Sequence, residues 1–380
     1  MRAVRTALVS LLLLSTMRAA QARQPSSPGG WSVDPKPLLV LGQDQADTNT
    51  SFAVVVGATR LADGRILVGD RGSVNLKLFA ADGKYLRSFA RKGKGPGEIQ
   101  YLKALLRCGD SVFTLDIDGD RTSVFSLEGK YVRVFRFGSP QGGPPYRSAC
   151  NRNRVFVHFG WEVRKQMTAG AYRGPVPFWI SGADSAVRRV FGDFPGSERL
   201  GQVVDGVMRG SRPLPLGKQP DVAIGADRVY IGTADRYEIG IYEFSGKEIG
   251  TIRKADVDLK TTRADIDNEM AKEIASCGDA CKDRIERHYA TIPFPRTVPA
   301  YVSLRVDFDG NLWVQEFPRA RSATVTWTVF TPQGRQLAGV SLPTHLEVYE
   351  IGPDYVLGRF LDPSESIPEV RLYRLRRGLP

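Results

Sequence analysis

The chain has 380 residues with 42% hydrophobic content, which is ample for the layered core of one all-β domain. Its formal net charge of +12 is spread through strands and turns and not gathered in blocks, which disfavours a nucleic-acid-binding protein. Beyond the N-terminal segment, no stretch approaches the roughly 20 apolar residues that a membrane-spanning helix needs.

The first residues have the three parts of a secretory signal peptide. A basic start precedes the apolar run Leu8–Leu14 and the small-residue cleavage site Ala20-Gln21-Ala22. We expect residues 1–22 to be removed and residues 23–380 to form a single domain in the periplasm or outside the cell. Lys and Arg then fall from 53 to 50 against 41 Asp and Glu, so the mature protein stays basic at +9.

Two stretches of the chain superimpose without a gap at a shift of 46 residues. The matched residues include Asp70 with Asp116, Phe79 with Phe125, and Gly83-Lys84-Tyr85 with Gly129-Lys130-Tyr131. Each copy reads as an apolar run, a polar turn, an alternating run, a glycine turn and another alternating run. A four-stranded unit of roughly 40–50 residues is typical of a propeller blade.

The repeat continues along the mature chain and predicts six blades. They fall at about 52–89, 101–137, 146–191, 221–252, 309–340 and 345–375, the third with a longer loop around 162–174. The last unit has only three strands of its own, and Pro37–Leu41 offers a fourth. The predicted fold is therefore an all-β, six-bladed β-propeller closed by an N-terminal strand.

One segment, about 256–298 between blades four and five, departs from the repeat. Thr262-Arg263-Ala264-Asp265 has capping-box spacing, and Ile266, Met270 and Ile274 recur at helical spacing. We predict two short helices joined at Gly278-Asp279. A lid over the channel mouth and a flap packed on blades four and five both remain open.

The four cysteines of an exported chain favour disulfides, with three pairings allowed. Cys108 and Cys150 occupy corresponding places in neighbouring blades, so we pair them and pair Cys277 with Cys281. The latter two are alternatively free thiols one helical turn apart, and without a nearby His they make a poor zinc site.

The loop Gly93–Ile99 reads Gly-Lys-Gly-Pro-Gly-Glu-Ile and resembles the Gly-x-Gly-Pro-Gly-Glu-Phe loop of exported bacterial six-bladed β-propellers related to NHL-repeat and TolB-like proteins. Asp309–Val314 and Asp354–Gly358 also look like that group. The resemblance covers nearly all of the mature chain. It implies the fold and says little about activity, since many such proteins have no assigned role.

The loops joining strands two and three should open on the same face as the loops between blades, and most of the unusual residues fall in these loops. We take that face, over the central channel, as the candidate ligand-binding surface. Its candidate residues are Arg71, Arg91, Lys94, Asp118, Asp120, Arg121, Arg236, Glu316 and Arg359. The recurring Asp70 and Asp116 are alternatively explained as turn caps.

Asp116, Asp118 and Asp120 stand at alternate positions, as carboxylates do in calcium loops. The EF-hand pattern fails, because Arg121 and Leu127 stand where it has Gly and Glu. A divalent cation such as calcium, shared with other loops over the channel, is the one cofactor left open.

Catalytic constellations are scarce. The three histidines, His158, His288 and His345, are dispersed, and no Gly-x-Ser-x-Gly elbow occurs. We expect a non-catalytic monomer that binds a protein, peptide or glycan through its loop face. The alternative is a metal-dependent hydrolase or lyase, gluconolactonase-like, with its site in the central channel.

Overall fold

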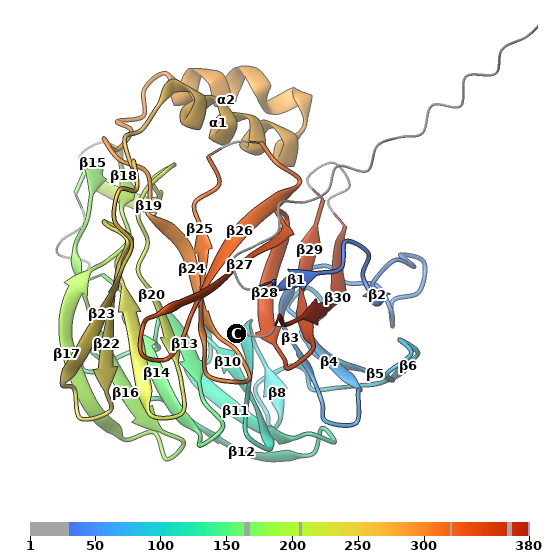
Figure 1. The fold of residues 1–380 in the computed structure, drawn as a ribbon. Coiled ribbons are helices and arrows are strands. Elements are labelled where there is room, and N and C mark those ends of the chain that lie inside the picture. The colour runs from blue at the N-terminus through green and yellow to red at the C-terminus, as the bar shows by residue number, and fades with distance from the viewer. Residues whose placement is uncertain (1–29, 163–167, 205–206, 320, 363–366, 379–380) are drawn as a thin grey trace, which may run out of the picture.

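A computed structural model describes residues 30–162, 168–204, 207–319, 321–362 and 367–378 (Figure 1). The expected signal peptide, residues 1–22, lies outside the described residues. β-Strands are the main secondary structure of the described chain, with two helices at one end of the molecule (Figure 1). No helix in this part of the chain is both long and apolar enough to span a membrane.

Six antiparallel sheets are built from consecutive strands, and five of them contain four strands. The strands of the first three are β3 (Val55–Arg60), β4 (Ile66–Asp70), β5 (Asn75–Phe79) and β6 (Tyr85–Phe89); β9 (Leu102–Cys108), β10 (Ser111–Asp116), β11 (Arg121–Ser126) and β12 (Tyr131–Phe135); and β13 (Arg147–Cys150), β14 (Val155–Phe159), β16 (Pro175–Gly182) and β17 (Val187–Pro195). Those of the next three are β20 (Asp221–Ile224), β21 (Arg228–Gly232), β22 (Glu238–Glu243) and β23 (Glu248–Arg253); β24 (Tyr301–Val306), β25 (Leu312–Glu316), β26 (Thr324–Phe330) and β27 (Gln336–Pro343); and β28 (Leu346–Ile351), β29 (Tyr355–Leu361) and β30 (Pro368–Arg376).

The repeated glycines explain the tight hairpins between the two outer strands. Gly83 and Gly129, at equivalent places in the first two sheets, have φ of 91° and 78°. An L side chain rarely adopts this conformation, whereas glycine adopts it freely. The 46-residue repeat therefore preserves the turns as well as the buried strands.

The first strand of each sheet lies innermost. Strands β3, β9, β13, β20, β24 and β28 contact one another in that order, and β28 contacts β3 again. Apolar side chains between adjacent sheets form the core, including Trp313 and Trp327, both almost completely buried. Six sheets around one axis are the arrangement of a six-bladed β-propeller.

The last sheet contains two short strands from the start of the described chain. Strand β2 (Leu39–Leu41) pairs antiparallel with β30, with Leu39 opposite Leu372, and β1 (Ser32–Val33) pairs further along β30. Strand β2 falls within Pro37–Leu41, the segment offered by the sequence as the fourth strand. Its Leu41 is buried beside Leu357 and Val370.

Two smaller sheets lie outside the six. The first contains β15 (Gly170–Tyr172), β18 (Arg199–Val204) and β19 (Val207–Pro213), and the second contains β7 (Arg91–Lys92) and β8 (Glu98–Ile99). The longer loop expected around 162–174 lies between β14 and β16, and the expectation is corrected at Gly170–Tyr172, which form the strand β15. This three-residue strand pairs with β18, which follows β17, and such a non-local pairing leaves little signal in a single sequence.

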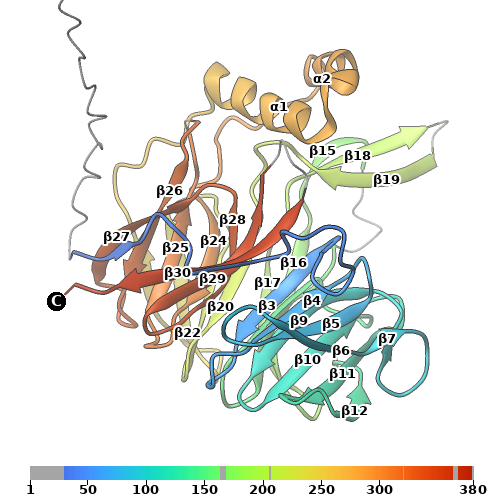
Figure 2. The same cartoon turned by 90° about the vertical axis from the view of Figure 1, so that its right-hand side faces the viewer.

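The helices α1 (Arg263–Cys277) and α2 (Lys282–Tyr289), with a 3₁₀ turn at Asp279–Cys281 between them, lie in the chain between β23 and β24. Thr262 caps α1 in a capping box with Asp265. Ile285 and Tyr289 pack with Leu214 and Leu200 of the β18–β19 region. Figures 1 and 2 show the helices and the three-stranded sheet at the same end of the molecule.

Two disulfides join Cys108 to Cys150 and Cys277 to Cys281, the two pairs that the sequence favours. The first links the innermost strands of two neighbouring sheets, β9 and β13. The second joins the end of α1 to the turn before α2.

If β2 is an integral strand, Leu41→Ala should lower the free energy of unfolding by about 2–5 kcal/mol, because it leaves a cavity in the core. Leu38→Ala is the matched control, since Leu38 is 50% exposed, and it should change stability by less than ~0.5 kcal/mol. Urea unfolding followed by circular dichroism measures both. Equal effects of the two variants would contradict the pairing of β2 with β30.

Candidate functional site

All six innermost strands begin at the same end of the axis, where the connections between sheets also lie. We call this end the mouth. Seven charged side chains, with at least one from every sheet, form a linked set that we call the mouth ring; most lie at this end, and Arg305, the fifth residue of β24, joins the set through its ion pair with Asp221. Its members are Arg71, Lys103, Arg147, Asp221, Arg305, Glu347 and Arg359.

Asp221 organises one side of the mouth ring. Its carboxylate lies 2.8 Å from Nε of Arg147 and 3.6 Å from Nη1 of Arg305, so it links β13, β20 and β24. It also accepts a 2.9 Å hydrogen bond from the backbone N–H of Leu304. The Asp221 side chain is almost completely buried, and a buried carboxylate needs partners of this kind.

Glu347 organises the part of the ring that belongs to the last sheet. Its Oε2 lies 2.8 Å from Nη2 of Arg359 and accepts a 3.2 Å hydrogen bond from the hydroxyl of Tyr349. The same hydroxyl contacts the backbone oxygen of Val55 at 3.1 Å, which connects the last sheet to the first. Burial and the neighbouring Glu347 carboxylate raise the pKa of Tyr349 above its usual value, so the phenol stays protonated.

Lys103 has a different environment. Its Nζ lies 4.6 Å from the ring centroids of both Tyr146 and Trp161, and in the described part of the chain it has no hydrogen-bond or ion-pair partner. Burial, followed by the positive charges of Arg147 and Arg71, lowers the pKa of Lys103 from 10.5 to about 8. Near neutral pH this amine is therefore a cation stabilised mainly by aromatic faces.

The mouth ring carries five cations against two carboxylates. Coulombic repulsion between like charges costs free energy when no anion is present, and a bound anion relieves it. The arrangement therefore suits an anionic ligand, and it contains no group placed as a nucleophile beside a general base.

Two of the nine residues predicted for the ligand face, Arg71 and Arg359, belong to the mouth ring. Arg71 stacks on Tyr101 at 5.2 Å. Arg359 pairs with Glu347, as described above.

The glycine-rich loop and its basic residues serve a different purpose. The Glu98 carboxylate accepts a 2.8 Å hydrogen bond from the N–H of Gly95 and pairs with Arg91 at 2.8 Å. A Cβ at Gly93 would lie only 2.0 Å from Glu98 Oε2, so the loop closes around its own carboxylate. Lys94 is exposed beside it. The position that an external anion would occupy is thus taken by Glu98.

Arg121 ties this loop to the second blade. It lies 3.2 Å from the Asp116 carboxylate and donates to the backbone oxygens of Gly93, Lys94 and Glu98. Asp116 in turn accepts hydrogen bonds from the N–H groups of Gln100, Tyr101 and Gly119. Both side chains therefore hold the connection between blades one and two.

The three aspartates considered for calcium do not converge. Asp116 is buried among amides, Asp118 is exposed, and Asp120 has a left-handed φ of 44°. Within the described residues, no cluster of three or more His, Cys, Asp or Glu side chains is placed to hold a metal ion.

The remaining two predicted residues also lie at the mouth end, although they are not members of the mouth ring: Glu316 is opposite Tyr301, the first residue of β24, and Arg236 follows β21, which ends opposite Asp221. Glu316 accepts hydrogen bonds from Tyr237, Lys254 and Thr328, and burial together with this carboxylate raises the pKa of Tyr237. Arg236 is exposed on the loop after β21.

Sequence reasoning missed Lys103, Arg147, Asp221, Arg305 and Glu347. All five lie on innermost strands, and four of them are the first or second residue of the strand. A charged residue at the first or second position of the innermost strand recurs in four of the six sheets, and this was the available signal, visible only when the repeats are compared at that position.

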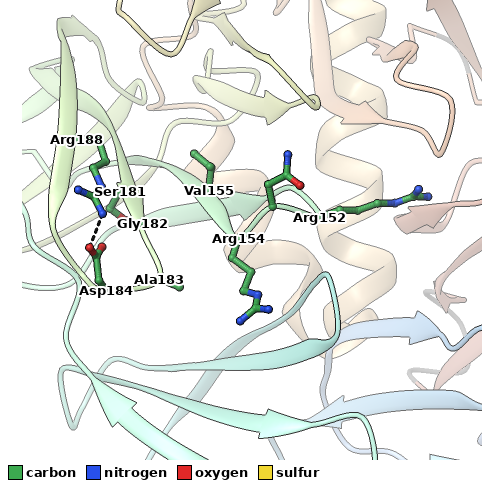
Figure 3. Close-up of a pocket in the computed structure, with 9 residues that line it drawn as sticks. Arg152, Arg154, Val155, Ser181, Gly182, Ala183, Asp184 and Arg188 are labelled. Carbon is green, nitrogen blue, oxygen red and sulfur yellow. Dashed lines mark hydrogen bonds and ion pairs between the residues drawn. The ribbon is translucent and has the colours of Figure 1, made fainter.

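An open cavity of about 580 Å³ lies at the other ends of β13 and β14 (Figure 3). Three arginines line it, but each already has a partner: Arg188 pairs with Asp184, Arg154 pairs with Asp110, and Arg152 stacks on Phe308. The cavity is therefore a weaker candidate for an anion than the mouth ring.

A family profile described as a 6-bladed beta-propeller matches residues 46–138, which span the first two sheets. Together with the six sheets around one axis, this match identifies the fold as a six-bladed β-propeller, as the sequence resemblance implies. No curated protein matches the sequence.

Solved structures with a similar chain path share little sequence. A member of the DUF4221 family from Bacteroides vulgatus has 9% identity and a TM-score of 0.49, over 91% of this chain and 99% of its own. A virginiamycin B lyase from Staphylococcus aureus has 11% identity and a TM-score of 0.38, over 89% and 98%. A luciferin-regenerating enzyme has 11% identity and a TM-score of 0.45, over 90% and 98%. At these identities and scores the likeness does not extend to ligands or activities.

Replacing Asp116 by Ala should cost about 3–5 kcal/mol of stability, because it leaves Arg121 and three backbone amides without their acceptor. Asp118→Ala is the matched control and should change stability by less than ~0.5 kcal/mol. Thermal unfolding with and without added calcium tests both. A comparable loss in the two variants, together with stabilisation of the parent protein by added calcium, would instead support a calcium loop.

The amine of Lys103 should react with acetic anhydride along a pH profile whose midpoint lies near 8, because only the neutral amine is nucleophilic. Peptide mass spectrometry follows the rate at this site, with Lys103→Arg as the control that removes the signal. A rate that still rises steeply above pH 9 would show that the mouth does not disfavour the charged amine.

Proposed function

We propose that this protein is an exported, non-catalytic β-propeller that binds an anionic ligand at its mouth ring. The observation that carries the proposal is the imbalance of five cations and two carboxylates drawn from all six sheets. Three of the arginines already pair with Asp221 or Glu347, so the sites left to attract an anion centre on Lys103 and Arg71. A protein, a peptide and a glycan all remain possible carriers of the anionic group.

Export is part of the same proposal. The two disulfides suit an oxidising compartment, and removal of residues 1–22 would release a chain that starts shortly before β1. In the mature protein, residues 23–380 form one domain, and the pairing of β2 with β30 closes the ring by giving the last blade its fourth strand.

The test is direct binding of two anionic probes, tetragalacturonate and tetraglutamate, by isothermal titration calorimetry at pH 7. Lys103→Ala should weaken the binding of at least one probe about tenfold, equivalent to about 1.4 kcal/mol. Binding should also weaken as the pH rises through 8, because Lys103 then loses its charge, and Lys103→Arg should remove this pH dependence.

Lys94→Ala is the matched control, because Lys94 is an exposed lysine on the loop between blades one and two. It should change affinity less than twofold. Absence of binding by both probes, or equal losses in the Lys94 and Lys103 variants, would refute the mouth ring as the site.

A further inference from the structure

Aromatic side chains accompany the cations on one side of the mouth. Lys103 lies between Tyr146 and Trp161, whose rings are nearly perpendicular at 89° with centroids 4.7 Å apart. Beside them, Arg71 stacks on Tyr101. These contacts come from the first three blades.

Trp161 stands out among the five tryptophans of the chain. It is 45% exposed, whereas Trp31, Trp179, Trp313 and Trp327 are all buried. A large ring left open to solvent at a charged mouth is poorly explained by stability, since burying it would be favourable. It is well placed to contact a ligand.

The combination of an exposed indole and neighbouring cations favours an acidic sugar over an acidic peptide. A pyranose ring offers an apolar C–H face that packs on an indole, and an acidic sugar also carries a negative group that pairs with a cation. An acidic peptide would use the cations and leave Trp161 without a role. Arg147 adds a planar donor group, with 38% of its side chain exposed beside its bond to Asp221.

Resting on the proposed function, we infer that the anionic ligand is an acidic glycan. One sugar ring stacks on Trp161, and its carboxylate or sulfate group lies among Lys103, Arg71 and Arg147. The box of Lys103, Tyr146 and Trp161 is then the element that selects a sugar over other anions.

The experiment measures the affinity of the full mature protein for four tetramers: galacturonate, a sulfated galactan, neutral galactose and glutamate. Tryptophan fluorescence gives a second readout, because Trp161 is the exposed indole. We expect an acidic tetrasaccharide to bind at least tenfold more tightly than both the neutral sugar and the peptide, with a change in fluorescence. The galacturonate and sulfated arms identify which acidic group is preferred.

Trp161→Ala should weaken binding of the preferred acidic sugar at least tenfold and abolish the fluorescence change, while Trp161→Tyr should retain most of the affinity. Phe308→Ala is the matched control, since Phe308 is another exposed ring. It stacks at 3.8 Å with Arg152, which lines the cavity of Figure 3 at the end away from the mouth. Phe308→Ala should change affinity less than twofold.

Two results would overturn the glycan assignment and leave the proposed function standing. The first is binding of tetraglutamate as tight as that of either acidic sugar, with sensitivity to Lys103→Ala. The second is an acidic sugar bound with no loss in Trp161→Ala. If none of the tetramers binds, or if Lys103→Ala binds all of them unchanged, the proposed function itself fails.

Discussion

The mouth depends on one constraint: the innermost strand of every sheet has an edge on which no further strand is paired. Unpaired backbone groups at such an edge need other partners. Here side chains bridge several of these strands to the next. Tyr349 contacts the oxygen of Val55, Arg305 donates to Val348, and the Asp221 carboxylate accepts from Leu304. Two of these three side chains, Arg305 and Asp221, also belong to the mouth ring.

Contacts between side chains and the backbone of neighbouring strands explain why the mouth ring holds more cations than carboxylates. Arg305 and Arg359 are held by backbone oxygens as well as by carboxylates, so they need not be matched one for one by acids. Backbone oxygens supply partial negative charge without adding a carboxylate. The arginines can therefore be buried and oriented while the mouth ring keeps an excess of positive charge.

The sequence predicts the repeated parts of the molecule well, because turn glycines and alternating strands recur at fixed spacing. Gly83 and Gly129 mark equivalent hairpins, and the capping box at Thr262 marks the start of α1. The site is harder to predict because its residues do not repeat. At the 46-residue shift, Lys103 aligns with Gly57, so a search for recurring residues passes over it. The predicted loop residues Arg91 and Arg121 instead hold the backbone of the connection between blades one and two.

The additions to the repeat are unevenly distributed, and this bears on how the proposed ligand would reach the mouth. The three-stranded sheet arises within blade three and between blades three and four, and the helices follow blade four. These two additions pack on each other through Leu200, Leu214 and Ile285. Arg319, after β25, fixes the segment before α1 by donating to the backbone oxygens of Asp258 and Lys260.

In the described residues, blades six, one and two carry no such addition. We call their side of the mouth the open side, and the side with the three-stranded sheet and the helices the layered side. The aromatic contacts of Arg71 and Lys103 come from blades one to three, at the border between the layered and the open sides of the mouth. A chain-like ligand entering over the open side would therefore meet Arg71 and Lys103 first. Trp161, at the edge of the layered side, would then set the point at which one unit of the ligand stops.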